Sequence, residues 1–253
     1  MNLGVSHFAF DLEESFLEFL NENNIKNIEV IFSKLDKWDN IDKKSIKNYH
    51  NIIKNYNLTS MSTQSLFFNS GCDTLSERKK ILYHVDKLIE FSKILGVKKM
   101  IFGSPSLRKK FDDWEFKLQQ LFYDIDRRLE KTDIEFLIEP NAKIYQGEYF
   151  FKLDEIISFI KKNNYYNIRT MICTHNLILE NENVLEKFDE YKDYIKHIHI
   201  SEIDLKPIND FEFHKKFSSL LKDCNYNNLI TYEIKKCDNI EASILDFIDI
   251  YKN

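Results

Sequence analysis

Acidic, imidazole and thiol side chains lie at the ends of apolar segments in the second half of the sequence. The runs IEFLI and LITY end in Glu139 and Glu233, RTMI ends in Cys173, and His197 and His199 alternate with isoleucines. A charge at the end of a buried strand is costly unless it is paired or bound to a metal ion. Carboxylates, imidazoles and thiolates are the ligands that Zn²⁺ or Mn²⁺ takes from proteins. The pattern therefore predicts one divalent-metal site, for Zn²⁺ or Mn²⁺, built from several strand ends.

Each of these residues also has a structural interpretation. A glutamate at a strand end can serve as a cap or an ion-pair partner, and a lone Cys173 is typical of a small buried residue. His197 and His199 are two residues apart, so they point to the same side of a strand, at different heights. Further polar residues follow other apolar segments and are candidates for substrate binding: His7, Lys34, Gln64, Arg108, His175, His197 and Lys235.

The elements that must position these residues alternate along the chain. Apolar segments of strand length occur at Leu3–Phe8, Ile28–Phe32, Leu58–Thr63, Val97–Phe102, Ile134–Glu139, Ile168–Cys173, Ile195–Ser201 and Leu229–Ile234. Amphipathic segments with helical spacing follow them at Asp11–Glu22, Ile41–Tyr56, Ser76–Leu95, Lys110–Lys131, Phe150–Lys162, Glu182–Tyr191, Phe211–Cys224 and Ile240–Tyr251. Eight such repeats predict an α/β fold, a (β/α)8 TIM barrel, as one domain over residues 1–253. A barrel brings the carboxyl ends of its strands to one face, where such folds place their chemistry.

Composition excludes several classes of protein. The chain has 253 residues, 43% hydrophobic and 30% charged, which is typical of a globular protein with a sizeable core. The net charge is −5 and basic residues are scattered, so we expect no nucleic-acid partner. No apolar run approaches the length of a membrane span, so no membrane partner is expected. Four cysteines without CxxC spacing predict free thiols in the cytoplasm. The sequence leaves open a homo-oligomer, and we expect His50, His84 and His214 on helix surfaces.

The sequence also resembles a known family of proteins, from about residue 25 to residue 236. The motifs that carry it are Ile28-Glu29-Val30, MSTQSLFF at 61–68, LGV at 95–97, FGSP at 102–105 with Arg108, Glu139-Pro140-Asn141 with YQG at 145–147, HIHISE at 197–202, and YEIK at 232–235. The chain resembles the xylose-isomerase-like barrels. This superfamily of sugar and sugar phosphate isomerases and epimerases also contains metal-dependent apurinic endonucleases.

The resemblance implies a set of metal ligands and shows one departure from it. In the family, a Glu, an Asp, a His and a Glu on strands five to eight hold the metal, and the matching positions are Glu139, Cys173, His199 and Glu233. Cys173 stands where the family has aspartate. A thiolate there is a softer ligand, which favours Zn²⁺ over Mg²⁺. The alternatives are that His175 fills the position, or that the metal has been lost.

The resemblance also implies an activity, a metal-dependent isomerisation or epimerisation of a small-molecule sugar or sugar phosphate. Glu139 and Glu233 would move a proton between adjacent carbons through an enediolate, and the substrate-binding candidates named above would orient the substrate. Glu202 would hold a neighbouring histidine or lysine. The alternatives are a lyase or an endonuclease-type hydrolase at the same site, and a degenerate barrel that binds a sugar or a partner without turnover.

Overall fold

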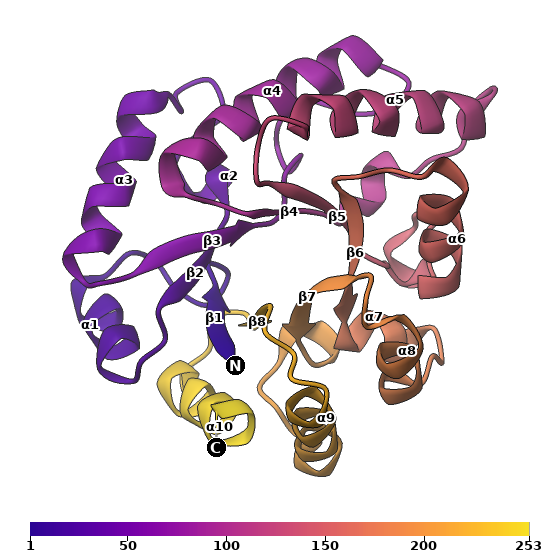
Figure 1. Ribbon diagram of the computed structural model, residues 1–253. Coiled ribbons are helices and arrows are strands. Elements are labelled where there is room, and N and C mark those ends of the chain that lie inside the picture. The colour runs from indigo at the N-terminus through magenta and orange to yellow at the C-terminus, as the bar shows by residue number, and fades with distance from the viewer. Residues whose placement is uncertain (253) are drawn as a thin grey trace.

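Eight parallel strands close into one barrel in the computed structural model, which describes residues 1–252 (Figure 1). The strands are β1 (Asn2–Ser6), β2 (Asn27–Val30), β3 (Thr59–Thr63), β4 (Lys99–Phe102), β5 (Glu135–Ile138), β6 (Ile168–Cys173), β7 (Ile195–Ile200) and β8 (Leu229–Tyr232). Each strand pairs with the next in sequence, and β8 pairs with β1 to close the ring. The predicted (β/α)8 barrel is confirmed.

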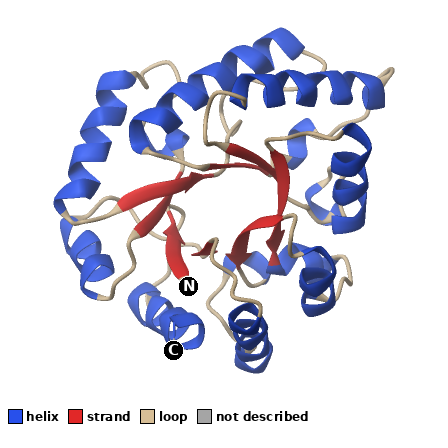
Figure 2. Ribbon diagram, viewed as in Figure 1, coloured by secondary structure: helices blue, strands red, loops and turns tan. Residues whose placement is uncertain are grey.

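Helices surround this barrel on its outside (Figure 2). They are α1 (Glu14–Glu22), α2 (Phe32–Leu35), α3 (Lys43–Asn55), α4 (Arg78–Leu95), α5 (Trp114–Leu129), α6 (Leu153–Asn163), α7 (Thr174–Leu179), α8 (Val184–Tyr191), α9 (Phe211–Asp223) and α10 (Ile240–Lys252). Single 3₁₀ turns lie at Pro105–Leu107, Lys143–Tyr145 and Ile203–Leu205. The short helices α2 and α7 were not predicted, and α7 begins directly after Cys173.

The barrel interior and the layer between strands and helices form separate apolar clusters. Ile101, Leu137, Met171 and Cys173 pack together from β4, β5 and β6, apart from the larger cluster of buried residues. Side chains alternate along a strand, so every second residue of β5 and β6 points into the barrel. Glu139 lies two residues beyond Leu137. The alternation that points Leu137 into the barrel interior therefore also points Glu139 inward, at the carboxyl end of β5.

Two helical histidines that we expected on the surface are buried. His84 approaches the carbonyl oxygen of Leu66 at 2.7 Å, and His214 lies 2.7 Å from the hydroxyl of Tyr251 and 3.2 Å from Glu202. The surface prediction was wrong for both residues, because these helix faces pack on neighbouring loops and helices. The expectation that Glu202 holds a histidine is confirmed by its contact with His214.

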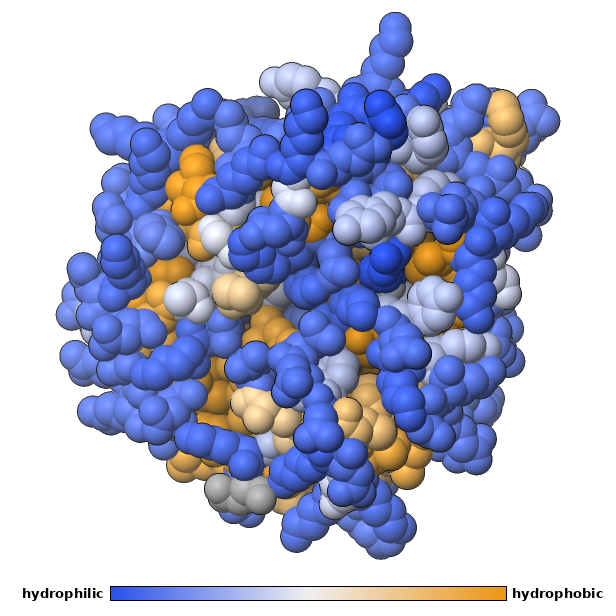
Figure 3. Space-filling view, in the orientation of Figure 1, coloured by the Kyte–Doolittle hydropathy of each residue, from blue (hydrophilic) through white to orange (hydrophobic). Residues whose placement is uncertain are grey.

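The outer surface is mostly hydrophilic on the face shown in Figure 3, with apolar side chains in scattered patches. None of the helices within residues 1–252 combines the length and apolar character needed to cross a lipid bilayer.

Candidate metal centre

Four side chains meet at the carboxyl end of the barrel. Glu139 follows β5, Cys173 ends β6, His199 lies near the end of β7, and Glu233 follows β8. Each offers one ligand atom, and these atoms all lie within 4.8 Å of one another. We call these four residues the donor set. The structure thus brings together, from four separate segments, the four residues that the family resemblance implies as metal ligands.

The spacing of the donor set fits a divalent cation. His199 Nδ1 lies 3.3 Å from Glu233 Oε2 and 3.5 Å from Glu139 Oε1, and Cys173 Sγ lies 3.9 Å from Glu233 Oε2. Tetrahedral zinc with ordinary bond lengths separates its ligand atoms by about 3.4 to 3.7 Å. His199 Nδ1 is buried and makes no hydrogen bond within the described residues. A nitrogen without a partner that faces two carboxylates and a thiol is the arrangement that a bound cation would complete.

Glu29 lies behind His199, on the side away from the donor set. Its Oε1 is 2.8 Å from His199 Nε2 and its Oε2 is 2.9 Å from His197 Nε2, while Gln64 Nε2 donates to Oε1 at 2.8 Å. A carboxylate at Nε2 favours a proton on that nitrogen, so a cation bound at the donor set would take the place of the proton on Nδ1. Metal-binding histidines are oriented by carboxylates in this way. From the sequence, Glu29 is one of the polar residues at strand ends, in the apolar stretch Ile28-Glu29-Val30, but we assigned it no role in the site.

The buried charges of the centre stabilise one another. Burial opposes the ionisation of Glu29, but His199 and His197 outweigh it and hold the pKa of Glu29 well below its usual value. Burial likewise opposes protonation of His199, yet Glu29 and Glu233 raise its pKa well above the ordinary range. The pKa of His197 is lowered, chiefly by burial. Burial also acts against the Glu139 carboxylate, but the contact with His199 keeps the pKa of Glu139 low.

The sulfur of Cys173 lies among several polar groups. Asn176 Nδ2 donates to Sγ at 3.1 Å, His175 Nδ1 is 3.3 Å away and Ser201 Oγ is 3.4 Å away. His175 Nδ1 also contacts Ser201 Oγ at 2.8 Å, and its Nε2 lies 3.3 Å from the Tyr145 hydroxyl. Burial disfavours the His175 cation, but Cys173 and the nearby glutamates raise its pKa to about 9. His175 therefore supports Cys173 from the side and is not a member of the donor set.

Two of the three cations considered for substrate binding, Arg108 and Lys34, hold loop backbone. The guanidinium of Arg108 is fully buried and donates to the carbonyl oxygens of Phe102 (2.6 Å), Glu139 (2.8 Å) and Phe150 (3.3 Å). Burial lowers the pKa of Arg108 to about 10. Lys34 Nζ donates to the carbonyl oxygens of two residues in the loop after β1 at 2.8 and 2.9 Å. Both side chains hold the backbone at the rim of the barrel. The N–H groups that make these contacts are ones that could otherwise bind a substrate phosphate.

The remaining substrate-binding candidates differ in position. Gln64 lies deep, between Glu29 and the Ser6 hydroxyl (2.8 Å), and His197 is buried beneath His199. His7 is buried with an Nδ1 that has no hydrogen-bond partner within residues 1–252. Lys235 is exposed at the end of β8. Their role in substrate binding stays a prediction.

Replacing His7 by phenylalanine is expected to flatten the pH dependence of stability. Burial, helped by Lys34, lowers the pKa of His7 from 6.5 to about 3. The unfolded chain therefore takes up a proton first, and stability is lost as the pH falls below the unfolded value toward the folded one. Between about pH 7 and about pH 5 this loss amounts to about 2 kcal/mol. Phenylalanine keeps the ring contact with Phe10 (5.3 Å) but does not titrate. Urea unfolding at both pH values measures the difference, and an equal loss in both proteins would contradict the assignment.

Glycine at position 103 leaves room for the Glu139 carboxylate. A methyl group on Gly103 would lie 2.4 Å from Glu139 Oε2. We expect Gly103→Ala to displace this carboxylate and to weaken zinc affinity roughly tenfold or more, as changes to the residues that orient metal ligands do. The fold should tolerate it, since the obstacle is the end of a flexible side chain. Gly147→Ala is the matched control, because its methyl group would meet nothing closer than 3.6 Å. Calorimetric titration with Zn²⁺ would measure both variants, and equal affinities would contradict the prediction.

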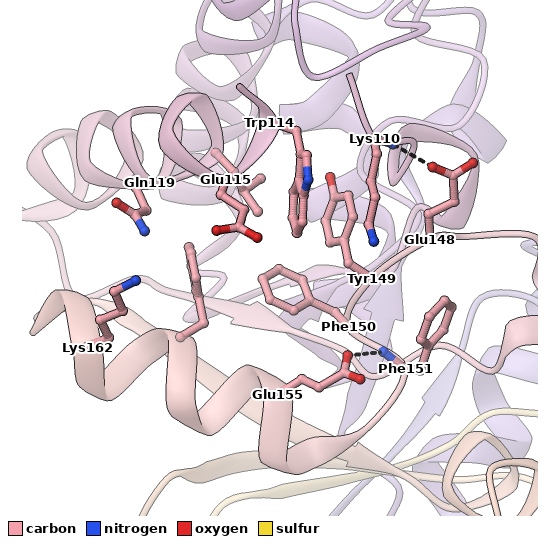
Figure 4. Close-up of a pocket in the computed structure, with 12 residues that line it drawn as sticks. Lys110, Trp114, Glu115, Gln119, Glu148, Tyr149, Phe150, Phe151, Glu155 and Lys162 are labelled. Carbon is pink, nitrogen blue, oxygen red and sulfur yellow. Dashed lines mark hydrogen bonds between the residues drawn. The ribbon is translucent and has the colours of Figure 1, made fainter. Parts of the chain in front are cut away.

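A separate groove of about 380 Å³ lies between α5 and α6 on the outside of the barrel (Figure 4). The rings of Trp114 and Tyr149 stack in it at 4.8 Å, with Lys110 beside Trp114 and Glu155 across from them on α6. None of the residues that line the groove belongs to the donor set.

Comparison with solved structures identifies many barrels of the same form. An AP endonuclease, family 2, from Brucella melitensis superposes with a TM-score of 0.80 at 14% identity, over 98% of both chains. A 3-keto-D-glucoside 4-epimerase from E. coli gives 0.79 at 16% identity over the whole of both chains. A D-psicose 3-epimerase from Clostridium cellulolyticum H10 gives 0.76 at 16% identity, over 100% of this chain and 92% of the other. At these identities the likeness shows the fold alone.

Comparison with curated proteins gives no match. A family model does match, over residues 17–250, and its description is the xylose isomerase-like TIM barrel. This range contains the whole donor set and nearly all of the barrel. The chain therefore belongs to the xylose isomerase-like TIM barrel family.

Proposed function

We propose that this protein is a metal-dependent epimerase or isomerase of a small sugar. The observation that carries the proposal is the donor set, four ligand atoms from β5 to β8 at distances that suit a divalent cation. The family match supports it, as do the structural neighbours described as sugar epimerases, which include an L-ribulose 3-epimerase.

The two glutamates of the donor set are the candidate acid and base. Glu139 and Glu233 keep 7% and 6% of their surface exposed, whereas Cys173 and His199 keep none. A substrate therefore approaches the centre from the carboxylate side. The metal, when bound, polarises the substrate carbonyl as a Lewis acid. One carboxylate removes the proton from the carbon beside that carbonyl, giving an enediolate. In an epimerisation the other glutamate, in its protonated form, donates its own proton to the opposite face of that carbon; in an isomerisation the first glutamate delivers the proton it took to the neighbouring carbon. Glu139 Oε1 faces His199, whereas its Oε2 lies against Gly103.

An unphosphorylated sugar suits the charges at the rim better than a sugar phosphate. Phosphate sites use free cations or backbone N–H groups. Arg108 is fully buried and directs its terminal N–H groups at carbonyl oxygens, and Lys34 contacts two carbonyl oxygens and the Asp11 carboxylate. Of the cations proposed from sequence for substrate binding, Lys235 is the one that makes no side-chain contact of this kind within the described residues. We propose that His7, Gln64, His175 and Lys235 orient sugar hydroxyl groups.

The experiment that tests this proposal is proton exchange on candidate sugars. Metal-loaded protein is incubated in deuterated water with free ketoses and aldoses and with their phosphate esters, and carbon-bound deuterium is followed by NMR. Deuterium at the carbon beside the carbonyl of a free sugar is the expected result. Exchange confined to phosphate esters would overturn the substrate class. Binding of sugars without exchange on any of them, by protein that holds its metal, would favour the alternative of a barrel that binds without turnover.

A further inference from the structure

We infer that the sulfur of Cys173 is a direct metal ligand and makes this centre selective for thiophilic ions, with Zn²⁺ preferred over Mn²⁺ and Mg²⁺. The inference rests on the proposed function for the existence of a metal site and adds which ion the site takes. It also decides among the alternatives that the sequence left open, namely Cys173 as ligand, His175 in its place, or no metal.

The position of the sulfur is the first argument. Cys173 is fully buried and points into the barrel, where it packs on Ile101, Leu137 and Met171. Its Sγ nevertheless lies within 4.8 Å of the ligand atoms of Glu139, His199 and Glu233. It therefore borders the apolar interior on one side and the carboxylates on the other. A thiol that served only as packing would not need to sit at this boundary.

The hydrogen bond from Asn176 is the second argument. The backbone N–H of Ala142 donates to Asn176 Oδ1 at 3.0 Å. That donor fixes the orientation of the amide, so the group 3.1 Å from the sulfur must be the NH₂. An N–H directed at sulfur stabilises the anionic thiolate, which is the form that binds metal. Asn176 thus acts as a positioning residue, because its N–H donates to the sulfur and holds it beside the other three members of the donor set.

The placement of His175 is the third argument. Its Nδ1 contacts Ser201 Oγ at 2.8 Å and its Nε2 lies 3.3 Å from the Tyr145 hydroxyl. Nδ1 also lies 3.3 Å from Cys173 Sγ, so His175 contacts the sulfur instead of taking its place, and neither ring nitrogen belongs to the group of possible ligand atoms.

The chemistry of the ligands then sets the choice of ion. Mg²⁺ and Mn²⁺ favour oxygen ligands, whereas thiolate and imidazole favour Zn²⁺. With aspartate in place of Cys173, three carboxylates and one histidine would hold the ion, and discrimination would be weaker. A zinc ion with four protein ligands can still bind a substrate oxygen, because zinc can expand to five-coordination.

Cobalt serves as the spectroscopic probe for the test. Metal-free protein is titrated with Co²⁺, and sulfur-to-cobalt charge transfer is sought in the near-ultraviolet. Zn²⁺ and Mn²⁺ then compete for the protein at equal concentration, and bound metal is measured by mass spectrometry. We expect the charge-transfer band and a zinc preference on the order of a hundredfold or more in the wild-type protein. Cys173→Asp should remove the band and reduce that preference at least roughly tenfold. Cys224→Ser, at the end of α9, is the control and should change neither.

Asn176→Ala is the second variant, because it leaves every ligand in place. We expect a roughly 10- to 100-fold loss of zinc affinity with the charge-transfer band retained. The spectrum of the wild-type protein decides the central question even if a variant does not fold. Stoichiometric Co²⁺ binding without the band would overturn the thiolate assignment and leave a metal-dependent function standing. Failure of Zn²⁺, Mn²⁺ and Co²⁺ to bind would overturn the proposed function together with the inference.

Discussion

Exchange of substrate protons should fall about 10²- to 10⁴-fold when Glu139 or Glu233 is replaced by glutamine, the range expected for loss of a positioned acid or base. Glutamine preserves the size of the side chain but cannot accept a proton. It also removes one negative charge from a centre in which His199 lies 3.5 Å from Glu139 and 3.3 Å from Glu233. Metal content should therefore fall as well, and deuterium exchange measured at saturating Zn²⁺ separates the two effects.

The matched control is Glu135→Gln, at the opposite end of the strand that leads to Glu139. Glu135 forms an ion pair with Lys99 at the amino end of β5, and its side chain is 25% exposed. The pair is partly buried and lies at the end of the barrel opposite the donor set. The control should therefore retain both metal and exchange. Wild-type exchange rates in Glu139→Gln or Glu233→Gln would remove that residue from the acid–base pair.

The second large effect is expected at Glu29, which touches no member of the donor set except His199. Glu29→Gln should lower the free energy of unfolding of the metal-free protein by about 3 to 5 kcal/mol, since breaking a buried ion pair leaves a charge without compensation. Zinc affinity should also fall roughly 10- to 100-fold, because the ring of His199 loses the carboxylate that orients it.

The lowered pKa of Glu29 determines how its contribution to stability changes with pH. The pKa of Glu29 is held below its ordinary value of 4.5, so its contribution is complete above that pH and is lost as the pH falls further. Urea unfolding at neutral pH and in acid should show a large difference between wild type and Glu29→Gln at neutral pH, and a smaller one in acid. A variant that unfolds within about 1 kcal/mol of wild type at neutral pH would show that the pair is not the buried ionic contact described here.

That several strand ends meet at one site could be predicted because strand alternation and barrel closure are regular, whereas the choice of the four members of the donor set came from the family resemblance. Leu137 points inward, so Glu139 does as well. The two-residue spacing of His197 and His199 likewise placed both rings inside the barrel. The order of the strands then brings the ends of β5 to β8 together without any further information.

The rest depended on contacts between distant segments. Glu29 is far from His199 in sequence, and nothing local to Ile28-Glu29-Val30 shows which residue lies across the barrel. Arg108 could equally have bound a phosphate, and its actual partners depend on the path of the loops after β4 and β5. Those loops include left-handed backbone at Ser104 (φ 41°) and Phe150 (φ 61°), which no spacing rule predicts.

The two halves of the barrel contribute unequally to the centre. All four donors come from β5 to β8, whereas β2 and the segment after β3 supply Glu29 and Gln64, which orient His199 from behind and contribute no member of the donor set. The second half thus supplies the metal ligands, and the first half supplies the residues that orient one of them. The two are joined through the β4–β5 and β8–β1 pairings. Metal affinity should consequently depend on closure of the barrel. If either pairing opened, the four ligands would remain on the second half, but Glu29 would no longer orient His199.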